Sequence, residues 1–549
     1  MTSGKTVNIA AHLPEMASSQ PDTPAIYFPV RGDYTSYTFR QLDLESNRIA
    51  LGLESIGIKR GVRTALMVKP GLEFFTLTFA LFKLGAVPVL IDPGMGLKNL
   101  KKCLAEAEPE AFIGIPQAHI ARLLLGWGKD TLKILLTVGR NLFWGGSTLE
   151  KVSGQVPEGS SYHMAETGED DRAAILFTSG STGIPKGAVY SHGNFAAQVE
   201  ALKKLYNITP GEIDLPTFPL FALFAPALGM TSVIPEMDFT RPGSVDPVKI
   251  ISAIKRFNIT SMFGSPALIN RVGSYGKEKE IKLPTLKRVI SAGAPVPSVV
   301  MERFSEMLEG GAEIFTPYGA TEALPVCSIG SREILEKTRQ LTEEGKGVCV
   351  GKAVDNIRLE IIKISDGPIE KWSEDLKARP GEIGEIIVKG AQVTKTYYNR
   401  SGSTELAKIE DGSYGSFFHR MGDLGYIDEV GRIWFCGRKS HRVGTAKGEL
   451  YTVPCEAIFN THRDVFRTAL VGIGKPGKME PVLCVETEKA VATSEHERIK
   501  KELLEIGRGY DITRNIRSIL FHPAFPVDIR HNAKIFREKL SVWAGEKLK

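Results

Sequence analysis

Short apolar runs alternate with segments of helical periodicity through the first 300 residues, and this alternation constrains the fold more than any other feature of the chain. Such a pattern is typical of parallel sheets covered by helices. The sequence therefore predicts an α/β fold with mostly parallel sheets in this part. The expected strands are residues 64–68, 87–91, 173–177, 261–263 and 286–292, and the expected helices are residues 74–84, 249–257 and 298–308.

The pattern changes near residue 355. Residues 359–362, 384–388 and 432–435 are β-rich and separated by turns, which predicts a smaller β unit. The last hundred residues alternate again, with strands expected near 468–471 and 482–486 and a helix over 495–504. A chain of 549 residues exceeds one ordinary core. We place a domain boundary in the polar link at 438–441, which gives domains 1–438 and 439–549.

Composition excludes several classes of protein. The 69 basic and 63 acidic residues give a net charge of +6, with no basic stripe of the kind that binds nucleic acid. The six cysteines are scattered and form no C-x-x-C pair, as expected for a reduced cytoplasmic protein without structural zinc. The N-terminus lacks the pattern of a signal peptide. Lysine or proline interrupts the apolar stretches 74–91 and 215–234, so neither is expected to be transmembrane.

A glycine- and hydroxyl-rich loop follows the expected strand at 173–177. Residues 178–187 read Thr-Ser-Gly-Ser-Thr-Gly-Ile-Pro-Lys-Gly. Glycines allow the backbone to approach an anion closely, and the hydroxyls and Lys186 can bind phosphate oxygens. The spacing is not that of a Walker A motif. By composition alone, such a stretch is more often only a flexible loop.

Further polar motifs follow in the second half of the chain. Taken singly, each has an ordinary structural explanation as a capped loop, a turn or a solvated lysine. The motifs are Ser-Ala-Gly-Ala-Pro at 291–295, Tyr-Gly-Ala-Thr-Glu at 318–322, Gly-Asp-Leu-Gly-Tyr at 422–426, Gly-Arg-Lys-Ser at 437–440 and Pro-Val-Asp-Ile-Arg-His-Asn-Ala-Lys-Ile at 526–535.

Together and in this order, the motifs resemble those of the adenylate-forming superfamily, which includes acyl-CoA synthetases, luciferases and peptide-synthetase adenylation domains. The resemblance runs from about residue 25 to residue 539. It implies a large N-terminal domain of two α/β subdomains plus a small β unit, followed by a small mobile α+β domain. It also implies ATP and Mg²⁺, and activation of a carboxylic acid as an acyl-adenylate with release of pyrophosphate.

The resemblance assigns roles to individual residues. Catalytic roles fall to Thr178, Glu322 and Lys534, with Glu322 also holding magnesium and Ser440 acting as the hinge. The residues implied in ATP binding are Thr178, Ser179, Gly180, Ser181, Thr182, Gly183, Lys186, Gly293, Ala294, Pro295, Tyr318, Gly319, Thr321, Asp423 and Arg438. Two departures stand out. Ser440 replaces the usual Asp or Lys, and residues 530–534 differ from the usual Thr-x-Ser-Gly-Lys.

The region that faces the acid in this superfamily is rich in phenylalanine. Ala222 stands where many relatives have histidine, and a small residue among apolar ones suggests room for a large acyl group. Filling of the core is an equally good explanation for any one of these side chains. The expected pocket residues are Phe218, Phe221, Ala222 and Phe224.

The variant motifs at 448–456 and 525–534 resemble one branch in particular, the β-lactone synthetases of bacterial long-chain olefin biosynthesis. This resemblance implies a 2-alkyl-3-hydroxy fatty acid as substrate, a β-lactone and AMP as products, and no need for coenzyme A. It also allows an assembly with the other enzymes of that pathway. The alternatives are a fatty acyl-CoA synthetase or fatty acyl-AMP ligase, and a catalytically inactive binding subunit. Lys186, Glu322, Asp423, Arg438 and Lys534 argue against the inactive subunit.

Two further observations concern the remaining motifs. Residues 472–477 fit G-x-G-x-x-G, but the segment after them resembles a strand, so we expect a strand–loop–strand turn instead of a dinucleotide site. No base for the 3-hydroxyl proton is evident. The candidates are His192, His441 and His531, although a histidine at any one of these positions more often has only a structural role.

Overall fold

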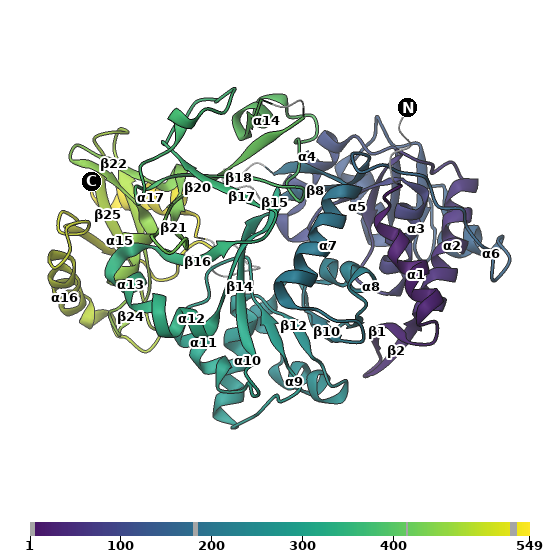
Figure 1. Ribbon diagram of the computed structural model, residues 1–549, viewed down its shortest axis with the longest axis horizontal. Coiled ribbons are helices and arrows are strands. Elements are labelled where there is room, and N and C mark those ends of the chain that lie inside the picture. Colours follow the sequence, from purple (N-terminus) through teal and green to yellow (C-terminus); the bar gives the residue numbers. More distant parts are fainter. Residues whose placement is uncertain (1–5, 179–184, 413–414, 528–534) are drawn as a thin grey trace.

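The computed structural model describes residues 6–178, 185–412, 415–527 and 535–549 (Figure 1). Residues 179–183 of the glycine-rich loop, together with His531 and Lys534, therefore lie outside the described residues. A large N-terminal part contains two sheets, and the chain after residue 439 forms a smaller part with a sheet of its own. The predicted α/β fold, with a large first part and a small second part, is confirmed.

The first sheet has seven strands in the order β7-β6-β5-β3-β4-β8-β9. All neighbours are parallel except β8 and β9, which form an antiparallel hairpin. The expected strands at 64–68, 87–91 and 173–177 are confirmed within one residue or so. The bounds are β3 (Arg63–Met67), β4 (Val87–Leu90), β5 (Ala111–Gly114), β6 (Ile134–Thr137), β7 (Ser147–Thr148), β8 (Arg172–Thr178) and β9 (Lys186–Ser191).

Helices cover both faces of this sheet because alternate strand residues are apolar on each side. Leu66 packs on one face and its neighbour Ala65 on the other. The helices of the first face are α1 (His12–Ser19), α2 (Phe39–Ser55), α3 (Leu72–Leu84) and α6 (Leu149–Gly154), and those of the second are α4 (Leu97–Ala107) and α5 (Pro116–Leu125).

The second sheet follows the order β17-β18-β20-β21-β16-β15-β14-β13-β12-β10-β11-β1-β2, with β19 beside β20. It is parallel from β1 to β14 through β11, β10, β12 and β13. Its bounds in that part are β1 (Pro24–Val30), β2 (Asp33–Thr38), β10 (Ile213–Pro216), β11 (Thr231–Val233), β12 (Ser261–Phe263), β13 (Arg288–Ile290) and β14 (Glu313–Ala320).

The β unit expected after residue 355 is present, but it is not a separate sheet. β16 pairs with β15 on one side and with β21 on the other, so its antiparallel strands continue the second sheet. The bounds are β15 (Ala323–Gly330), β16 (Val348–Ala353), β17 (Arg358–Ile362), β18 (Gly384–Lys389), β19 (Lys408–Glu410), β20 (Phe417–Ile427) and β21 (Ile433–Arg438), with α14 (Ser401–Ala407) beside them.

Helices also pack on both sides of the second sheet. One face carries α9 (Pro247–Arg256), α10 (Pro266–Glu278) and α11 (Ser298–Ser305), whose apolar residues share one core with the parallel strands. On the other side, α7 (His192–Tyr206) and α8 (Ala225–Leu228) lie between the two sheets (Figure 1). The site described below is bounded by this second side.

The C-terminal part has β24 (Val465–Ile473), β25 (Glu480–Thr487) and β26 (Ser518–Phe521), with a small hairpin of β22 (Val443–Thr445) and β23 (Gly448–Leu450). Its helices are α15 (Thr452–Phe459), α16 (His496–Arg508) and α17 (Arg537–Lys547). β24 and β25 are antiparallel, so residues 472–477 lie in a hairpin and not before a helix. The prediction that this motif is no dinucleotide site is confirmed.

Two expectations from composition can be compared with the structure. The six cysteines are all buried and unpaired. Within the described ranges, no helix is both long enough and apolar enough to cross a bilayer.

Candidate active site

A single large cavity, with a volume of about 2600 Å³, lies where the two sheets and the C-terminal part meet. The carboxyl ends of the parallel strands β13 and β14 open into it, which is the usual place for a ligand in an α/β sheet. The cavity brings together residues that are far apart in sequence. Those expected to bind ATP that line it are Lys186, Gly293, Ala294, Pro295, Tyr318, Gly319, Thr321, Asp423 and Arg438, and Glu322 lies with them.

Two glycines shape the wall beside these strands. Gly293 has a φ of +96°, a left-handed conformation that other residues rarely adopt. A Cβ on Gly319 would lie 2.5 Å from the carbonyl oxygen of Ala323, so a side chain there would force the β14–β15 hairpin apart. Both positions keep the backbone close to the space in which a ligand would bind.

Tyr318, Asp423 and Arg438 form a polar group on one side of the cavity. The Tyr318 hydroxyl donates to Asp423 Oδ2 at 2.7 Å, and Arg438 Nη1 lies 2.9 Å from Asp423 Oδ1. Burial raises the pKa of Asp423, while Arg438 and Tyr318 oppose that shift. Because Arg438 is poorly oriented toward Oδ1, this buried oxygen accepts no hydrogen bond from the described residues. It is therefore free to accept from a ligand hydroxyl.

Glu322 lies in a second polar cluster. Its Oε1 accepts a 2.6 Å hydrogen bond from the Tyr397 hydroxyl. Lys408 donates to the Thr394 carbonyl next to this pair, and burial lowers the pKa of Lys408 to about 7. His419 lines the cavity nearby, and burial, with Lys408 and Lys186 adding to it, lowers its pKa well below the usual value.

Sequence reasoning missed Tyr397, Lys408 and His419. Each comes from a segment without a recognisable motif, and only tertiary contacts bring them beside Glu322. No local sequence pattern distinguishes these three residues from other polar residues of the chain.

The glycine-rich loop spans the tip of the β8–β9 hairpin. Thr178 and Lys186 are partners in the register of that hairpin, so the loop begins and ends at one edge of the first sheet. Lys186 Nζ lies 5.1 Å from the centroid of the Tyr397 ring. From the same strand, Tyr190 donates to the carbonyl oxygen of Thr321. Strand β9 thus connects the loop to the motif at 318–322.

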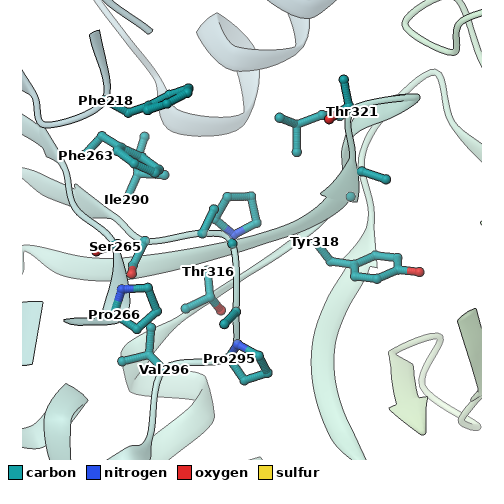
Figure 2. A pocket seen from close by; sticks show the side chains of 18 of the residues that line it. Phe218, Phe263, Ser265, Pro266, Ile290, Pro295, Val296, Thr316, Tyr318 and Thr321 are labelled. Atoms are coloured by element: carbon teal, nitrogen blue, oxygen red, sulfur yellow. The ribbon is translucent and has the colours of Figure 1, made fainter. Parts of the chain in front are cut away.

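An apolar arm of the cavity extends away from these polar groups. The Phe221 ring lies 5.2 Å from that of Phe218 and 4.6 Å from that of Phe263. Figure 2 shows Phe218, Phe263 and Ile290 gathered on one side, with Tyr318 and Thr321 on the other. Phe224 also lines the cavity. Such a lining suits a long hydrocarbon chain beside a polar reacting group.

Ala222 differs from its expected place in the pocket. It is only 4% exposed, packs in the core of the first sheet, and is not among the described residues that line the cavity.

The three candidate histidines have different surroundings. His192 is buried, its Nδ1 accepts from the backbone of Ile9 at 3.2 Å, and burial lowers its pKa to about 4. It does not line the cavity. His441 does line the cavity, and His531 lies outside the described residues. The surroundings of His192 are those of a packing residue.

The C-terminal part closes one end of the cavity. Ser440 lines it from the short helix η8 (Lys439–His441), directly after β21. Glu456 of α15 also faces it, paired with Arg537 at 2.7 Å, and burial raises the pKa of Glu456 to about 7. Within the described ranges, no group of three or more His, Cys, Asp or Glu residues could hold a metal by itself. Glu322 alone suits magnesium, which keeps waters and phosphate oxygens as its other ligands.

Comparison with known proteins identifies the class. The model of the family "AMP-binding enzyme" matches residues 13–398. The chain belongs to this family. Among solved structures, the amide bond synthetase McbA from Marinactinospora thermotolerans superposes with a TM-score of 0.80 at 21% identity, covering 97% of this chain and 99% of that one. The structure of ATP-bound MatB from Rhodopseudomonas palustris superposes with a TM-score of 0.78 at 22% identity, covering 99% of this chain and 99% of that one. At these identities the likeness concerns the fold alone.

Two curated relatives are much more similar in sequence. The chain is 50% identical to the olefin beta-lactone synthetase of Xanthomonas campestris pv. campestris and 51% identical to that of Stenotrophomonas maltophilia. In both comparisons the match covers 98% of each protein. A long-chain-fatty-acid–CoA ligase of Salmonella typhimurium is 24% identical over 83% of this chain. Within the AMP-binding enzymes, the chain therefore groups with the olefin beta-lactone synthetases.

Proposed function

We propose that the protein converts a long-chain 2-alkyl-3-hydroxyalkanoic acid and ATP into a β-lactone, AMP and pyrophosphate, as a step of olefin biosynthesis. The observation that carries the proposal is the identity of 50% and 51% with two olefin beta-lactone synthetases over 98% of the chain. The apolar arm beside the polar groups supports it, because a branched long-chain acid needs both.

The described residues fit ATP as the first substrate. Among the residues that the structure describes, none donates a hydrogen bond to Oδ1 of the buried Asp423 carboxylate, which lies 2.9 Å from Arg438 Nη1, and this oxygen suits a ribose hydroxyl. Tyr318 offers a ring beside it for the adenine, and Arg438 supplies a positive charge. Lys186, with the loop that begins at Thr178, would bind the phosphates. Gly293 and Gly319 line the cavity beside these groups, where the nucleotide would lie.

Magnesium would be held by Glu322 together with the phosphates of ATP. The ion supplies positive charge that offsets the negative charge of the phosphates. Tyr397 orients the Glu322 carboxylate through its 2.6 Å hydrogen bond, and Lys408 adds a nearby cation when it is protonated. These two residues keep the carboxylate in one orientation.

The first chemical step forms a bond between a carboxylate oxygen of the acid and the α-phosphorus of ATP. The bond from that phosphorus to the bridging oxygen breaks, and pyrophosphate leaves. Negative charge develops on the phosphoryl oxygens, and a fixed lysine stabilises it. We assign this role to Lys534.

The second step closes the ring. The 3-hydroxyl oxygen of the same molecule attacks the carbonyl carbon, its proton is lost, and AMP leaves. Holding the hydroxyl close to the carbonyl turns the closure into a well-oriented intramolecular reaction. The narrow aromatic arm formed by Phe218, Phe221 and Phe263 would restrict the two chains of the acid. No coenzyme A enters this scheme.

Rotation of residues 439–549 about Ser440 would allow one cavity to serve both steps. The proposed boundary between residues 438 and 439 falls between β21 and η8. We further propose that the enzyme acts in the cytoplasm, in an assembly with the other enzymes of its pathway.

The deciding experiment incubates the purified protein with ATP, Mg²⁺ and a long-chain 2-alkyl-3-hydroxy acid, without coenzyme A, and identifies the product by NMR. We expect a β-lactone and an equal amount of AMP. Accumulation of the acyl-adenylate, with conversion to a thioester when coenzyme A is added, would instead identify an acyl-CoA synthetase.

A further inference from the structure

Helix α5 is apolar on both of its long sides. Ala118, Ala121 and Leu125 pack inward against the first sheet, while Leu123 and Leu124 belong to the opposite side and are exposed. Leu124 is 80% exposed. A helix that is apolar all round is normally buried in a core or in a membrane. The exposed residues of α5 are Ile120, Leu123 and Leu124 together with one polar residue, Gln117, so its outer side is mostly apolar.

A neighbouring loop adds to this surface. Leu142 and Phe143 follow β6 and are both exposed, Phe143 to 74%. The loop is held against α5 by Trp144, whose ring stacks on that of His119 at 5.1 Å. The Trp144 Nε1 also donates to Thr137 Oγ1 at 2.8 Å. The exposed side chains thus belong to a rigidly anchored surface, which we call the α5 surface: Ile120, Leu123, Leu124, Leu142 and Phe143.

The segment that carries the α5 surface has an excess of basic residues. Between residues 111 and 149, the acidic residue Asp130 is outnumbered by Arg122, Lys129, Lys133 and Arg140. Among the residues that the structure describes, no carboxylate forms an ion pair with Lys129, Lys133 or Arg140, and all three are exposed. Helix α4, which covers the same face of the sheet, adds the exposed residues Lys98, Lys101 and Lys102, against the exposed Glu108 at its end (Figure 1).

The cavity reaches the base of the same surface. Ile115 and Ala118, at the start of α5, line it, as do Leu100 of α4 and Trp127 just after α5. The inner side of α5 therefore borders the cavity, while its outer side carries the α5 surface.

We propose that the α5 surface docks the protein on a bilayer that contains anionic phospholipid. Exposed leucines and a phenylalanine, in a segment with an excess of exposed lysine and arginine, are the combination that binds a lipid interface. A protein partner with an apolar patch would satisfy the leucines but would leave the excess positive charge without a counterpart. The inference does not depend on the reaction that the enzyme catalyses.

The test is co-sedimentation of the full-length protein with vesicles, in the absence of substrate. One set of vesicles mixes phosphatidylglycerol with phosphatidylcholine, and the other is phosphatidylcholine alone. We expect binding to the mixed vesicles that weakens as salt is added. The double variant L124E/F143E should lose at least tenfold in affinity. V542E, which places a single negative charge at an exposed apolar residue of α17, is the control and should bind normally.

A second variant separates charge from apolar contact. K129Q/K133Q/R140Q should lose about a hundredfold on mixed vesicles, at about fivefold for each basic residue, and little on neutral ones. Thermal unfolding and ATP-dependent pyrophosphate release with a detergent-dispersed acid should be unchanged in all variants, because these residues lie outside the site.

Two outcomes would overturn the proposal. Either the wild-type protein does not sediment with the mixed vesicles, or L124E/F143E sediments with them as the wild type does. If the wild type fails to bind vesicles but is a dimer that L124E/F143E converts to monomers, the α5 surface is a contact between copies of the chain. Neither result bears on formation of the β-lactone.

Discussion

The Tyr318 hydroxyl donates a 2.7 Å hydrogen bond to Oδ2 of Asp423, across 105 residues of sequence. Tyr318 comes from β14 and Asp423 from β20, two strands of the second sheet that are not neighbours. Arg438 of β21 lies on the other oxygen of the same carboxylate. The antiparallel continuation of the sheet therefore places the Asp423 carboxylate beside the end of the parallel strand β14.

Asp423→Asn tests the assignment of this carboxylate. The amide keeps the shape but removes the charge that a ribose hydroxyl and Arg438 would share, and hydrogen bonds to charged groups are worth about 1.5–3 kcal/mol. We expect the KM for ATP to rise about tenfold or more, measured by pyrophosphate release. Asp355→Asn, at an exposed residue paired only with Lys204, is the control and should leave the KM unchanged. An unaltered KM in Asp423→Asn would remove Asp423 from the ATP site.

Glu322→Gln tests the magnesium ligand. Glutamine can still accept the hydrogen bond from Tyr397, so the local structure is preserved while the charge is lost. We expect the concentration of Mg²⁺ needed for half-maximal activity to rise several-fold and the maximal rate to fall. Titration of Mg²⁺ at saturating ATP measures both. A Mg²⁺ dependence identical to that of the wild type would contradict the assignment.

Lys534→Ala should slow formation of the adenylate about a hundredfold or more, because it removes a charge that stabilises the transition state. Binding of ATP, followed by equilibrium titration, should change little. Lys539→Ala is the matched control, since Lys539 lies on α17 against the ring of Phe536. Near-normal single-turnover rates in Lys534→Ala would show that another residue has this role.

Ser440→Pro should slow complete turnover, because proline restricts the backbone at the proposed hinge. Adenylate formation and lactone release are measured separately by rapid quench, and Ser440→Ala serves as the control. If lactone forms in the proline variant as fast as in the wild type, one arrangement of the two parts serves both steps.

The raised pKa of Asp214 should make the free energy of unfolding depend on pH. Asp214 lies on β10 opposite Ser261, and burial raises its pKa from 3.8 to about 7. Between these values the folded protein holds a proton that the unfolded chain has lost, so the free energy of unfolding falls as pH rises. The Asp214→Asn variant has no carboxyl to ionise here, so its free energy of unfolding does not fall with pH for this reason. We expect its Tm to exceed that of the wild type by several degrees more at pH 8 than at pH 4. Asp130→Asn, at an exposed site, should show no such trend. A constant difference in Tm would mean that the carboxyl is not buried as described.

Much of the local structure was predictable because apolar periodicity reports which residues face a core. The strand at 63–67, the helix at 72–84 and the hairpin around 472–477 follow from it. Ala222 shows the limit of such reasoning. Its place in a Phe-rich motif indicates the pocket wall, yet the turn at 219–224 directs it into the core.

The sequence by itself determined the class of the protein, because the motifs that bind nucleotides are short, contiguous and in a fixed order. It also predicted candidate site residues such as Lys186, Glu322 and Asp423, all of which line the cavity. Only the tertiary structure decided what surrounds them. The contact of Tyr397 with Glu322 and the exposed outer side of α5 depend on how distant segments pack. Hydrogen bonds and burial between such segments follow from the geometry of the sheets, which no local pattern of residues encodes.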